Sequence, residues 1–204
     1  MKRKEFLKKS VFFGAGSMFL PNLSGYSNIN ISSNDQINIG AIGINGMGWG
    51  NVQKAMEIPG VKLVAVCDID ENVIKRRINS EEGRSIKNEV KIYSDYRKML
   101  DQNDIDVVYI GTPDHWHALM MINAAAAGKH IYVEKPIGNS IGECEAMVEA
   151  QKRYGNIIQV GQWQRSSTHF QDAMSFVHSG KLGPIRTVKV FCYQGWMRPQ
   201  PKVA

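Results

Sequence analysis

The chain has 204 residues, of which 43% are hydrophobic and 22% are charged. This composition excludes a disordered, collagen-like or coiled-coil protein, because a chain of this length and hydrophobicity can bury the core of at least one domain. The formal net charge is +6, but the first nine residues hold five basic residues and one acidic residue, which leaves 20 basic and 18 acidic residues for the remainder. Because the remainder has no basic stripe and no interleaving of basic and aromatic residues, we expect no nucleic-acid partner.

Residues 1–34 are typical of an export signal followed by a linker. The basic cluster is followed by an apolar run over 10–20 and then by Pro21 and a polar stretch rich in Ser and Asn. The apolar run is shorter than the roughly 20 residues that a membrane-spanning helix needs, so we expect no stable membrane span. The segment from Arg3 to Lys8 resembles the twin-arginine signal, with Lys4 in place of the second arginine. We therefore expect export to the periplasm or cell envelope; the alternative is a cytoplasmic protein with an amphipathic N-terminus.

From residue 37 the chain alternates apolar, β-branched runs with helical stretches. Runs of this kind are typical of strands that are covered on both faces, and strand–helix alternation at this spacing predicts right-handed crossovers. The sequence therefore predicts an α/β fold, a Rossmann-type doubly wound parallel sheet, over 35–160. The expected strands are 37–43, 61–67, 106–111, 130–134 and 157–161, and the expected helices are about 46–58, 70–80, 94–102, 115–127 and 141–154.

Several helix ends are also predicted by their residues. Ser140 and Glu143 form a capping-box pattern that starts the helix at 141. Gly128 and Gly155 stand where left-handed C-caps end helices before the next strand. Past residue 161 the pattern changes to a helix near 168–179, a turn over 180–184 and a strand over 185–193. Residues 161–204 are thus expected to be the incomplete beginning of an α+β C-terminal domain, since one strand is not a domain.

A glycine-rich loop directly follows the first expected strand and precedes a helix. A dinucleotide-binding loop needs glycine for its tight turn, for the approach of the pyrophosphate and for helix–strand packing, and the helix N-terminus supplies donors for the phosphates. Asp68 ends the second strand, where a carboxylate can accept hydrogen bonds from both ribose hydroxyls and repel a 2′-phosphate. Since Ile69 and Asp70 offer no arginine for that phosphate, NAD is favoured over NADP; a plain glycine turn with a capping aspartate is the alternative. The loop comprises Gly43, Ile44, Asn45, Gly46, Met47 and Gly48.

Two further motifs identify a family. A TPxxxH element is formed by Thr112, Pro113 and His117, and an AxxxGKHxxxEKP element runs from Ala124 to Pro136. In this order and separation they resemble the Gfo/Idh/MocA oxidoreductases, the glucose-fructose oxidoreductase and inositol dehydrogenase family. The resemblance covers residues 37 to about 193.

This resemblance implies a reaction and roles for several residues. The reaction is hydride transfer between NAD and a secondary hydroxyl of a sugar or polyol. Thr112, Pro113 and His117 would lie along the cofactor, and Glu134 and Lys135, with a cis peptide before Pro136, would close over the nicotinamide ribose. Lys135 would be the catalytic residue, because an ammonium group can hydrogen-bond the substrate oxygen and stabilise negative charge that develops on it.

The resemblance also implies a second domain that carries the sugar site and the oligomer contacts. We therefore expect a homo-oligomer only if the full C-terminal sheet is present. Gln162 and Arg165 are candidates for contacts with polyol hydroxyls, and Trp163 is a candidate for stacking on a sugar or on the nicotinamide; interdomain packing and a surface ion pair are the equal alternatives. The family's catalytic histidine, with an aspartate one turn before it, is not matched by His169 or His178.

No metal site is expected from the sequence. His115 and His117 open a helix, where side chains two residues apart diverge, and no third ligand stands nearby at a convincing spacing. Three cysteines without CxxC spacing argue against a zinc cluster or a disulfide framework.

Two other functions remain open at this point. One is a non-catalytic nucleotide-binding fragment. The other is an NAD-dependent glycosidase-like enzyme, although Lys135 argues against it, because that branch of the superfamily tends to lack this lysine.

Overall fold

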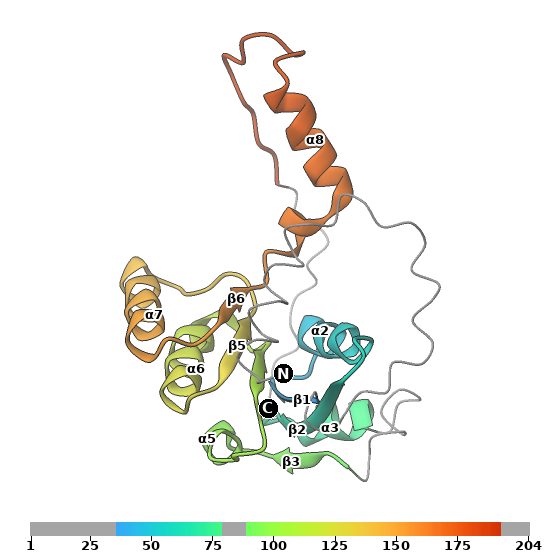
Figure 1. Ribbon diagram of the computed structural model, residues 1–204, viewed down its shortest axis with the longest axis vertical. Helices are drawn as coiled ribbons and strands as arrows, with labels where there is room; N and C mark the ends of the chain where they lie inside the picture. The colour runs from blue at the N-terminus through green and yellow to red at the C-terminus, as the bar shows by residue number, and fades with distance from the viewer. Residues whose placement is uncertain (1–35, 79–88, 193–204) are drawn as a thin grey trace, which may run out of the picture. The chain divides into compact units, whose positions relative to one another are not determined.

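The computed structural model describes residues 36–78 and 89–192. The chain divides after Gly161 into two compact units. The first unit is a three-layer α/β domain whose six strands are arranged in the order β3-β2-β1-β4-β5-β6 (Figure 1). All neighbouring strands run parallel. This is the doubly wound Rossmann order, so the fold class predicted from the sequence is confirmed.

The strands lie where the sequence places them, with one addition. The strand β3 is a three-residue edge strand, Lys-Ile-Tyr, that pairs with β2 and that the sequence pattern did not predict. Its two residues before the tyrosine are exposed, so it lacks the buried apolar run that identifies its neighbours. The strands are β1 Ile37–Ile42, β2 Val61–Cys67, β3 Lys91–Tyr93, β4 Val107–Ile110, β5 His130–Val133 and β6 Ile158–Val160.

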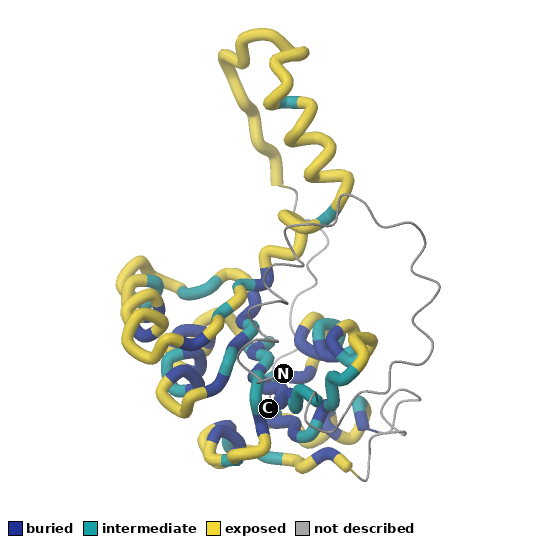
Figure 2. Tube along the Cα trace, in the orientation of Figure 1, coloured by how far each residue is buried: buried dark blue, intermediate teal, exposed yellow. Residues whose placement is uncertain are grey.

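Helices cover both faces of the sheet. The helices of this unit are α2 Met47–Met56, α3 Glu71–Ile78, α5 Tyr96–Leu100, α6 Asp114–Ala126 and α7 Ile141–Tyr154. Buried side chains of α2 and α3 form one apolar cluster with the sheet, and those of α5, α6 and α7 form a second cluster. Figure 2 shows the buried chain concentrated along the strands and the inner sides of these helices. The apolar stripes of the helices therefore fix which face each one covers.

The predicted helix ends are present, with one difference in detail. The Ser140 hydroxyl accepts a hydrogen bond from the backbone N–H of Glu143 at 3.2 Å. The Glu143 carboxylate accepts from the N–H of Asn139 at 2.5 Å, one residue earlier than the usual capping box provides. Gly155 ends α7 with φ of 69°, the left-handed conformation that favours glycine. Gly128, at φ 78°, follows α6 in the same way.

Lys129 has a structural place in the domain. Its side chain is 6% exposed, and its ammonium group donates to the carbonyl oxygens of Gln102 at 2.5 Å and Ile105 at 3.1 Å. Burial lowers the pKa of Lys129, because desolvation disfavours the charged form. The Asn156 amide donates to the Lys129 carbonyl at 2.7 Å. The lysine thus ties the loop before β4 to the start of β5.

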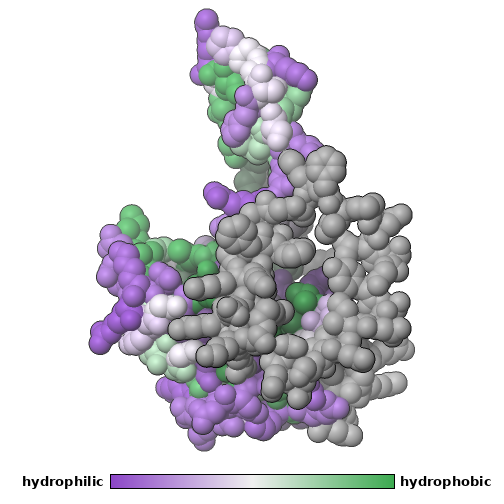
Figure 3. Space-filling view, in the orientation of Figure 1, coloured by the Kyte–Doolittle hydropathy of each residue, from purple (hydrophilic) through white to green (hydrophobic). Residues whose placement is uncertain are grey.

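The second unit comprises a 3₁₀ turn, Trp163–Ser166, and the helix α8, Thr168–His178. The predicted strand over 185–193 was wrong for the part that the structure describes, because residues 185–192 have no strand conformation. A strand needs a hydrogen-bonded neighbour, and the described residues of this unit supply none. Figure 3 shows hydrophobic surface on this unit. It comes from exposed side chains that include Phe170, Met174, Phe176 and Leu182.

The expected export signal, residues 1–34, lies outside the described residues. Within 36–78 and 89–192, no helix is both long enough and apolar enough to cross a membrane.

Candidate functional site

The turns that follow the strands meet at one edge of the sheet, because parallel strands share a carboxyl edge. Gly43 follows β1, Asp68 follows β2, Ser94 follows β3, Gly111 follows β4 and Glu134 follows β5. Ligands of doubly wound sheets bind at this edge, next to the point where the strand order reverses. Here the reversal falls at β1, between β2 and β4.

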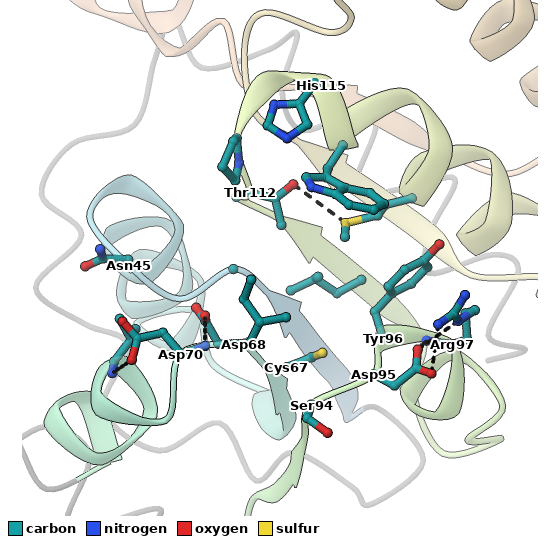
Figure 4. A pocket seen from close by; sticks show the side chains of 18 residues that line it. Asn45, Cys67, Asp68, Asp70, Ser94, Asp95, Tyr96, Arg97, Thr112 and His115 are labelled. Atoms are coloured by element: carbon teal, nitrogen blue, oxygen red, sulfur yellow. Dashed lines mark hydrogen bonds and ion pairs between the residues drawn. The ribbon is translucent and has the colours of Figure 1, made fainter. Parts of the chain in front are cut away.

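A pocket of about 740 Å³ opens at this edge. Its walls come from the turns after β1, β2, β3 and β4 and from the first turns of α5 and α6. Figure 4 shows Asp68 and Asp70 on one side of it and Tyr96 and Arg97 on another. Five of the residues predicted to bind a cofactor line the pocket, namely Gly43, Asn45, Asp68, Thr112 and Pro113.

Three glycines bring the backbone of β1, α2 and β4 into direct contact. Gly43 has φ of 76°, and its N–H donates to the Cys67 carbonyl at 2.8 Å. A Cβ on Gly48 would overlap the Gly43 carbonyl oxygen, and a Cβ on Gly111 would lie 2.5 Å from the Gly48 Cα. Only glycine fits at Gly48 and Gly111, so the N-terminus of α2 can contact the ends of β1 and β4. We call this contact among Gly43, Gly48 and Gly111 the glycine crossing.

The N-terminus of α2 is open to an anion. Its N-cap is Gly46, which has φ of 48° and provides no side-chain hydrogen bond to the first turn. The first backbone N–H groups of a helix have no partners within the helix, and the helix dipole places partial positive charge there. Here the N–H of Gly48 donates to the Asn45 carbonyl oxygen and the N–H of Gly46 donates to Asn45 Oδ1, both at 3.1 Å, so a phosphate would share these donors with Asn45. A phosphate group fits this position in both charge and hydrogen bonding.

Asp68 holds the glycine loop in place. Its Oδ2 accepts from the N–H of Ile44 at 3.0 Å, and its Oδ1 accepts from the N–H of Asp70 at 3.0 Å. The carboxylate is partly exposed and lines the pocket, so lone pairs remain for ligand hydroxyls.

Two arginines of α3 hold the same loop from the outside. Arg77 Nε donates to the Ile44 carbonyl at 3.2 Å, and Arg76 Nη2 donates to Asn45 Oδ1 at 3.3 Å. The loop is therefore held by the turn after β2 and by α3, and its conformation does not depend on its own residues alone.

His117 lies beside the pocket wall, in the interior, and is 1% exposed. Its Nε2 is 2.7 Å from the Thr112 carbonyl oxygen, and its Nδ1 is 2.6 Å from the Pro136 carbonyl oxygen. Each ring nitrogen therefore lies within hydrogen-bond distance of a backbone carbonyl oxygen. His117 thus ties the end of β4 to the loop after β5. The peptide before Pro136 is cis, as the resemblance implied.

Glu134 is 5% exposed and is held by groups from two elements. Its Oε1 accepts from Asn51 Nδ2 of α2 at 2.8 Å, and its Oε2 accepts from the N–H of Lys135 at 3.1 Å. Burial, and then the negative charge of Glu134, raises the pKa of Tyr132. The side chain of Lys135 is exposed. Glu134 and Lys135 do not line the pocket described above.

A family model for the oxidoreductase family with an NAD-binding Rossmann fold matches residues 37–162. The chain belongs to the Gfo/Idh/MocA family. Its domain over these residues is an NAD-binding Rossmann domain, with the glycine crossing and Asp68 at the carboxyl edge of the sheet.

Two curated proteins illustrate the likeness to this family. An oxidoreductase of Bacillus subtilis (strain 168), YrbE, is 35% identical over 155 residues, which are 76% of this chain and 44% of that protein. A glycosyl hydrolase family 109 protein of Shewanella pealeana is 33% identical over 122 residues, 58% of this chain and 27% of that protein. The chain thus spans less than half the length of these relatives.

Solved structures of inositol dehydrogenases share the fold. The myo-inositol 2-dehydrogenase from Lactobacillus plantarum has a TM-score of 0.64 at 29% identity, covering 74% of this chain and 43% of that one. The scyllo-inositol dehydrogenase from Lactobacillus casei, solved with NAD(H) and scyllo-inositol, has a TM-score of 0.63 at 28% identity, covering 72% and 42%.

The remaining residues predicted for the Gfo/Idh/MocA site are not among the residues that line the pocket. Ile44 is buried at 0% exposure, Gly48 is buried in the glycine crossing, and Met47 is 53% exposed. Gln162, Trp163 and Arg165 belong to the second unit, where all three are exposed. His115 lines the pocket, and within the described ranges no group of three or more His, Cys, Asp or Glu side chains is placed to hold a metal ion.

The structure also adds residues that the sequence reasoning missed. Ile69, Tyr96 and Trp116 line the pocket of this Gfo/Idh/MocA domain. Trp116 lies inside the TPxxxH element, which was the one signal available for it. Tyr96 follows β3, the strand that the pattern did not show.

The charged side chains that line the pocket include the carboxylates of Asp68 and Asp95. Asp95 caps α5 and is paired with Arg97, whose Nε and Nη2 donate to its two oxygens at 2.9 and 3.0 Å. These hydrogen bonds lower the pKa of Asp95. Burial, together with the charges of Asp68 and Asp95, raises the pKa of the Cys67 thiol to about 12. Cys67 therefore contributes a neutral thiol to the wall of the Gfo/Idh/MocA pocket and does not act as a nucleophile at neutral pH.

Proposed function

We propose that this chain is the cofactor-binding part of an enzyme that transfers hydride between NAD and a secondary hydroxyl of a sugar or polyol. The observation that carries the proposal is the combination of the open N-terminus of α2, the glycine crossing and Asp68 at one edge of the sheet. A structural neighbour with this fold holds NAD(H) and scyllo-inositol. The chain covers 42% of that neighbour, so the reaction is proposed for a protein that carries the substrate domain as well.

Different residues would bind different parts of the cofactor. The loop from Gly43 to Gly48 would receive the pyrophosphate on backbone N–H groups. The carboxylate of Asp68 would accept hydrogen bonds from the adenosine ribose hydroxyls. Thr112 and Pro113 would form the wall along the cofactor. His117 would support that wall from behind, through the Thr112 carbonyl.

The chemistry would fall to Lys135. When bound, NAD supplies the acceptor for the hydride. The Lys135 ammonium would donate a hydrogen bond to the substrate hydroxyl oxygen and stabilise negative charge on it, while the hydroxyl proton would pass to the catalytic histidine of the substrate domain and the hydride would leave the carbon for NAD. Glu134 would hold the backbone of Lys135 through the bond to its N–H. Gln162, Trp163 and Arg165 are the proposed contacts with the substrate.

A glycosidase is the second candidate, because one relative at 33% identity is a glycosyl hydrolase family 109 protein. Lys135 favours the oxidoreductase, since its ammonium is suited to an oxygen that gains negative charge. An assay of the protein with its substrate domain separates the two: a dehydrogenase produces NADH from NAD and a polyol, and a glycosidase releases an aryl leaving group with no net NADH.

Export by a twin-arginine-type signal is also part of the proposal, on the strength of the basic and apolar pattern in residues 1–34. Cell fractionation tests it. Replacement of Arg3 by Gln would retain an exported protein in the cytoplasm, and an unchanged distribution would contradict the export signal.

The cofactor claim is tested by titrating the 204-residue chain with NADH and following nicotinamide fluorescence. We expect a saturable change that Asp68→Ala weakens by about tenfold, because a ribose partner and a loop tether are both lost. Lys98→Met, at an exposed lysine of α5 that does not line the pocket, would leave NADH affinity within about twofold. No saturable signal would overturn the proposal.

A Lys135→Met variant tests the catalytic role of Lys135 in the protein that carries its substrate domain. There we expect turnover to fall by at least about a hundredfold, far more than NADH affinity. Retained turnover would remove Lys135 from the mechanism.

A further inference from the structure

Glu134 is a buried carboxylate that is held without a cation. It is 5% exposed, and none of the ion pairs among the described residues involves it. A buried carboxylate without a cation needs hydrogen-bond donors, because burial removes the water around it. The donors that surround Glu134 therefore decide where its two oxygens point.

Three segments enclose this carboxylate. On its own segment, Oε2 accepts from the N–H of Lys135 at 3.1 Å. The turn after β6 passes close by, since a Cβ on Gly161 would stand 2.7 Å from Glu134 Oε1 and 2.9 Å from the Tyr132 hydroxyl oxygen. The third segment is α2, from which Asn51 Nδ2 donates to Glu134 Oε1 at 2.8 Å. Asn51 lies 83 residues before Glu134, so this bond joins two distant parts of the chain.

Glu134 lies on the half of the sheet that would take the nicotinamide. A doubly wound sheet binds a dinucleotide across the point where the strand order reverses, with one mononucleotide on each half. Asp68 follows β2, whereas Glu134 follows β5, on the other side of the reversal. Since Asp68 would take the adenosine ribose, the Glu134 carboxylate is placed to take the ribose of the nicotinamide.

We propose that Asn51 is a positioning residue for this half of the site. The inference rests on the proposed function and adds to it the side chain that orients Glu134 and, through Glu134 Oε2, the backbone of Lys135. An amide suits this role, because it donates a hydrogen bond and adds no positive charge, so the charge of the carboxylate is left for ligand hydroxyls. The helix that carries Asn51 is itself held in place by the glycine crossing.

The first experiment titrates the 204-residue chain with NADH and with ADP in a calorimeter. ADP has the adenosine and both phosphates of the cofactor but lacks the nicotinamide ribose. We expect Asn51→Leu, which removes the donor at a similar side-chain size, to weaken NADH by about tenfold and to leave ADP within about twofold. A general disturbance of α2 would weaken both ligands, because the N-terminus of α2 would bind the phosphates of both.

A double-mutant cycle tests the pair itself. Asn51→Asp puts a second carboxylate within hydrogen-bond distance of Glu134 and should weaken NADH by at least about tenfold. In a Glu134→Gln background, the new carboxylate can accept from the introduced amide, so Asn51→Asp should there cost less than about threefold. Gln53→Glu adds the same charge to α2 at a partly exposed position and is the matched control, which should stay within about twofold.

A kinetic measurement follows the effect to Lys135 in the protein that carries its substrate domain. Asn51→Leu should lower kcat by about tenfold and leave the KM for the polyol within about threefold, because the proposed substrate contacts come from residues after Gly161. An unchanged kcat would overturn the link from Asn51 to Lys135.

The binding outcomes separate this inference from the proposed function. If NADH and ADP bind the wild type, and Asn51→Leu changes neither or weakens both equally, the positioning role is overturned and the cofactor claim stands. If Asn51→Asp costs the same with Glu134 and with Glu134→Gln, Asn51 does not act through the carboxylate and the inference is overturned. If neither ligand binds the wild type, the cofactor claim itself fails, and the positioning role fails with it.

Discussion

Gly111 is the glycine whose replacement should be most informative. It lies at the end of β4, and an added Cβ would stand 2.5 Å from the Gly48 Cα, 3.0 Å from the Gly43 carbonyl oxygen and 3.2 Å from the Gly48 nitrogen. Ordinary van der Waals contact begins near 3.4 Å, so the first of these distances is short by roughly 0.9 Å. All three neighbours are backbone atoms that cannot rotate away. Gly111→Ala therefore has to push α2 away from β4, and overpacking of this kind costs about 1–3 kcal/mol.

Gly50→Ala is the matched control, because Gly50 lies inside α2 and an added Cβ there meets nothing within 4 Å. Alanine in a helix interior is more favourable than glycine by about 0.5–1 kcal/mol. Urea unfolding followed by circular dichroism should thus show a lower free energy of unfolding for Gly111→Ala and a higher one for Gly50→Ala than for the wild type. NADH titration should show weaker binding in Gly111→Ala alone. Wild-type stability and NADH affinity in Gly111→Ala would refute the close crossing of β4 and α2.

Three further predictions concern Cys67, Lys129 and Asp68. The pKa of the Cys67 thiol is 9.0 in the unfolded chain and about 12 in the folded one, so the free energy of unfolding should fall by up to about 4 kcal/mol as the pH rises from 9.0 to 12. Over the same pH range, the urea midpoint of Cys67→Ala should fall less than that of the wild type. Lys129→Met leaves the carbonyl oxygens of Gln102 and Ile105 without their donor and should cost about 1–3 kcal/mol of unfolding free energy, against less than about 0.5 kcal/mol for the exposed Lys98→Met. Asp68→Asn loses a negative charge and turns an amide N–H₂ toward a backbone N–H, so fluorescence titration should show NADH affinity lowered by about tenfold and the preference for NADH over NADPH reduced.

The sheet could be predicted from the sequence because its central strands are buried on both faces. Runs such as Val61–Cys67 have few polar residues, and their length and β-branching separate them from helices. The edge strand Lys91–Tyr93 has neither property, since it is three residues long and two of them are exposed. Its pairing with β2 joins residues that are distant in the sequence, so a local sequence pattern does not predict it. The residues around it, including Tyr96, were therefore missed as part of the pocket.

The segment over 185–192 shows the opposite error. Its apolar and β-branched residues predict a strand, yet β conformation is a property of a pair of strands and not of a single one. The described residues of the second unit include no partner for it. The residues favour β conformation, but the described part of this unit contains no second strand with which they could pair.

The candidate site could be predicted only where its residues lie in one continuous stretch of the sequence. The loop from Gly43 to Gly48 carries its own pattern of strand, glycines and helix. Gly111 stands 63 residues beyond Gly48, and nothing in the local sequence reports that their backbones touch. The burial of His117 was hidden for the same reason, since its two carbonyl partners follow different strands.

The helix α2 connects the two halves of the proposed cofactor site. Its N-terminus is set against β1 and β4 by the glycine crossing, and one turn later Asn51 donates to the Glu134 carboxylate at 2.8 Å. Glu134 in turn accepts from the N–H of Lys135. A displacement of α2 of about 1 Å is enough to break a hydrogen bond of ordinary length, because the attraction weakens steeply beyond about 3.5 Å. The crowding that Gly111→Ala introduces on the phosphate side should therefore reach the lysine on the nicotinamide side, through one helix and one buried carboxylate.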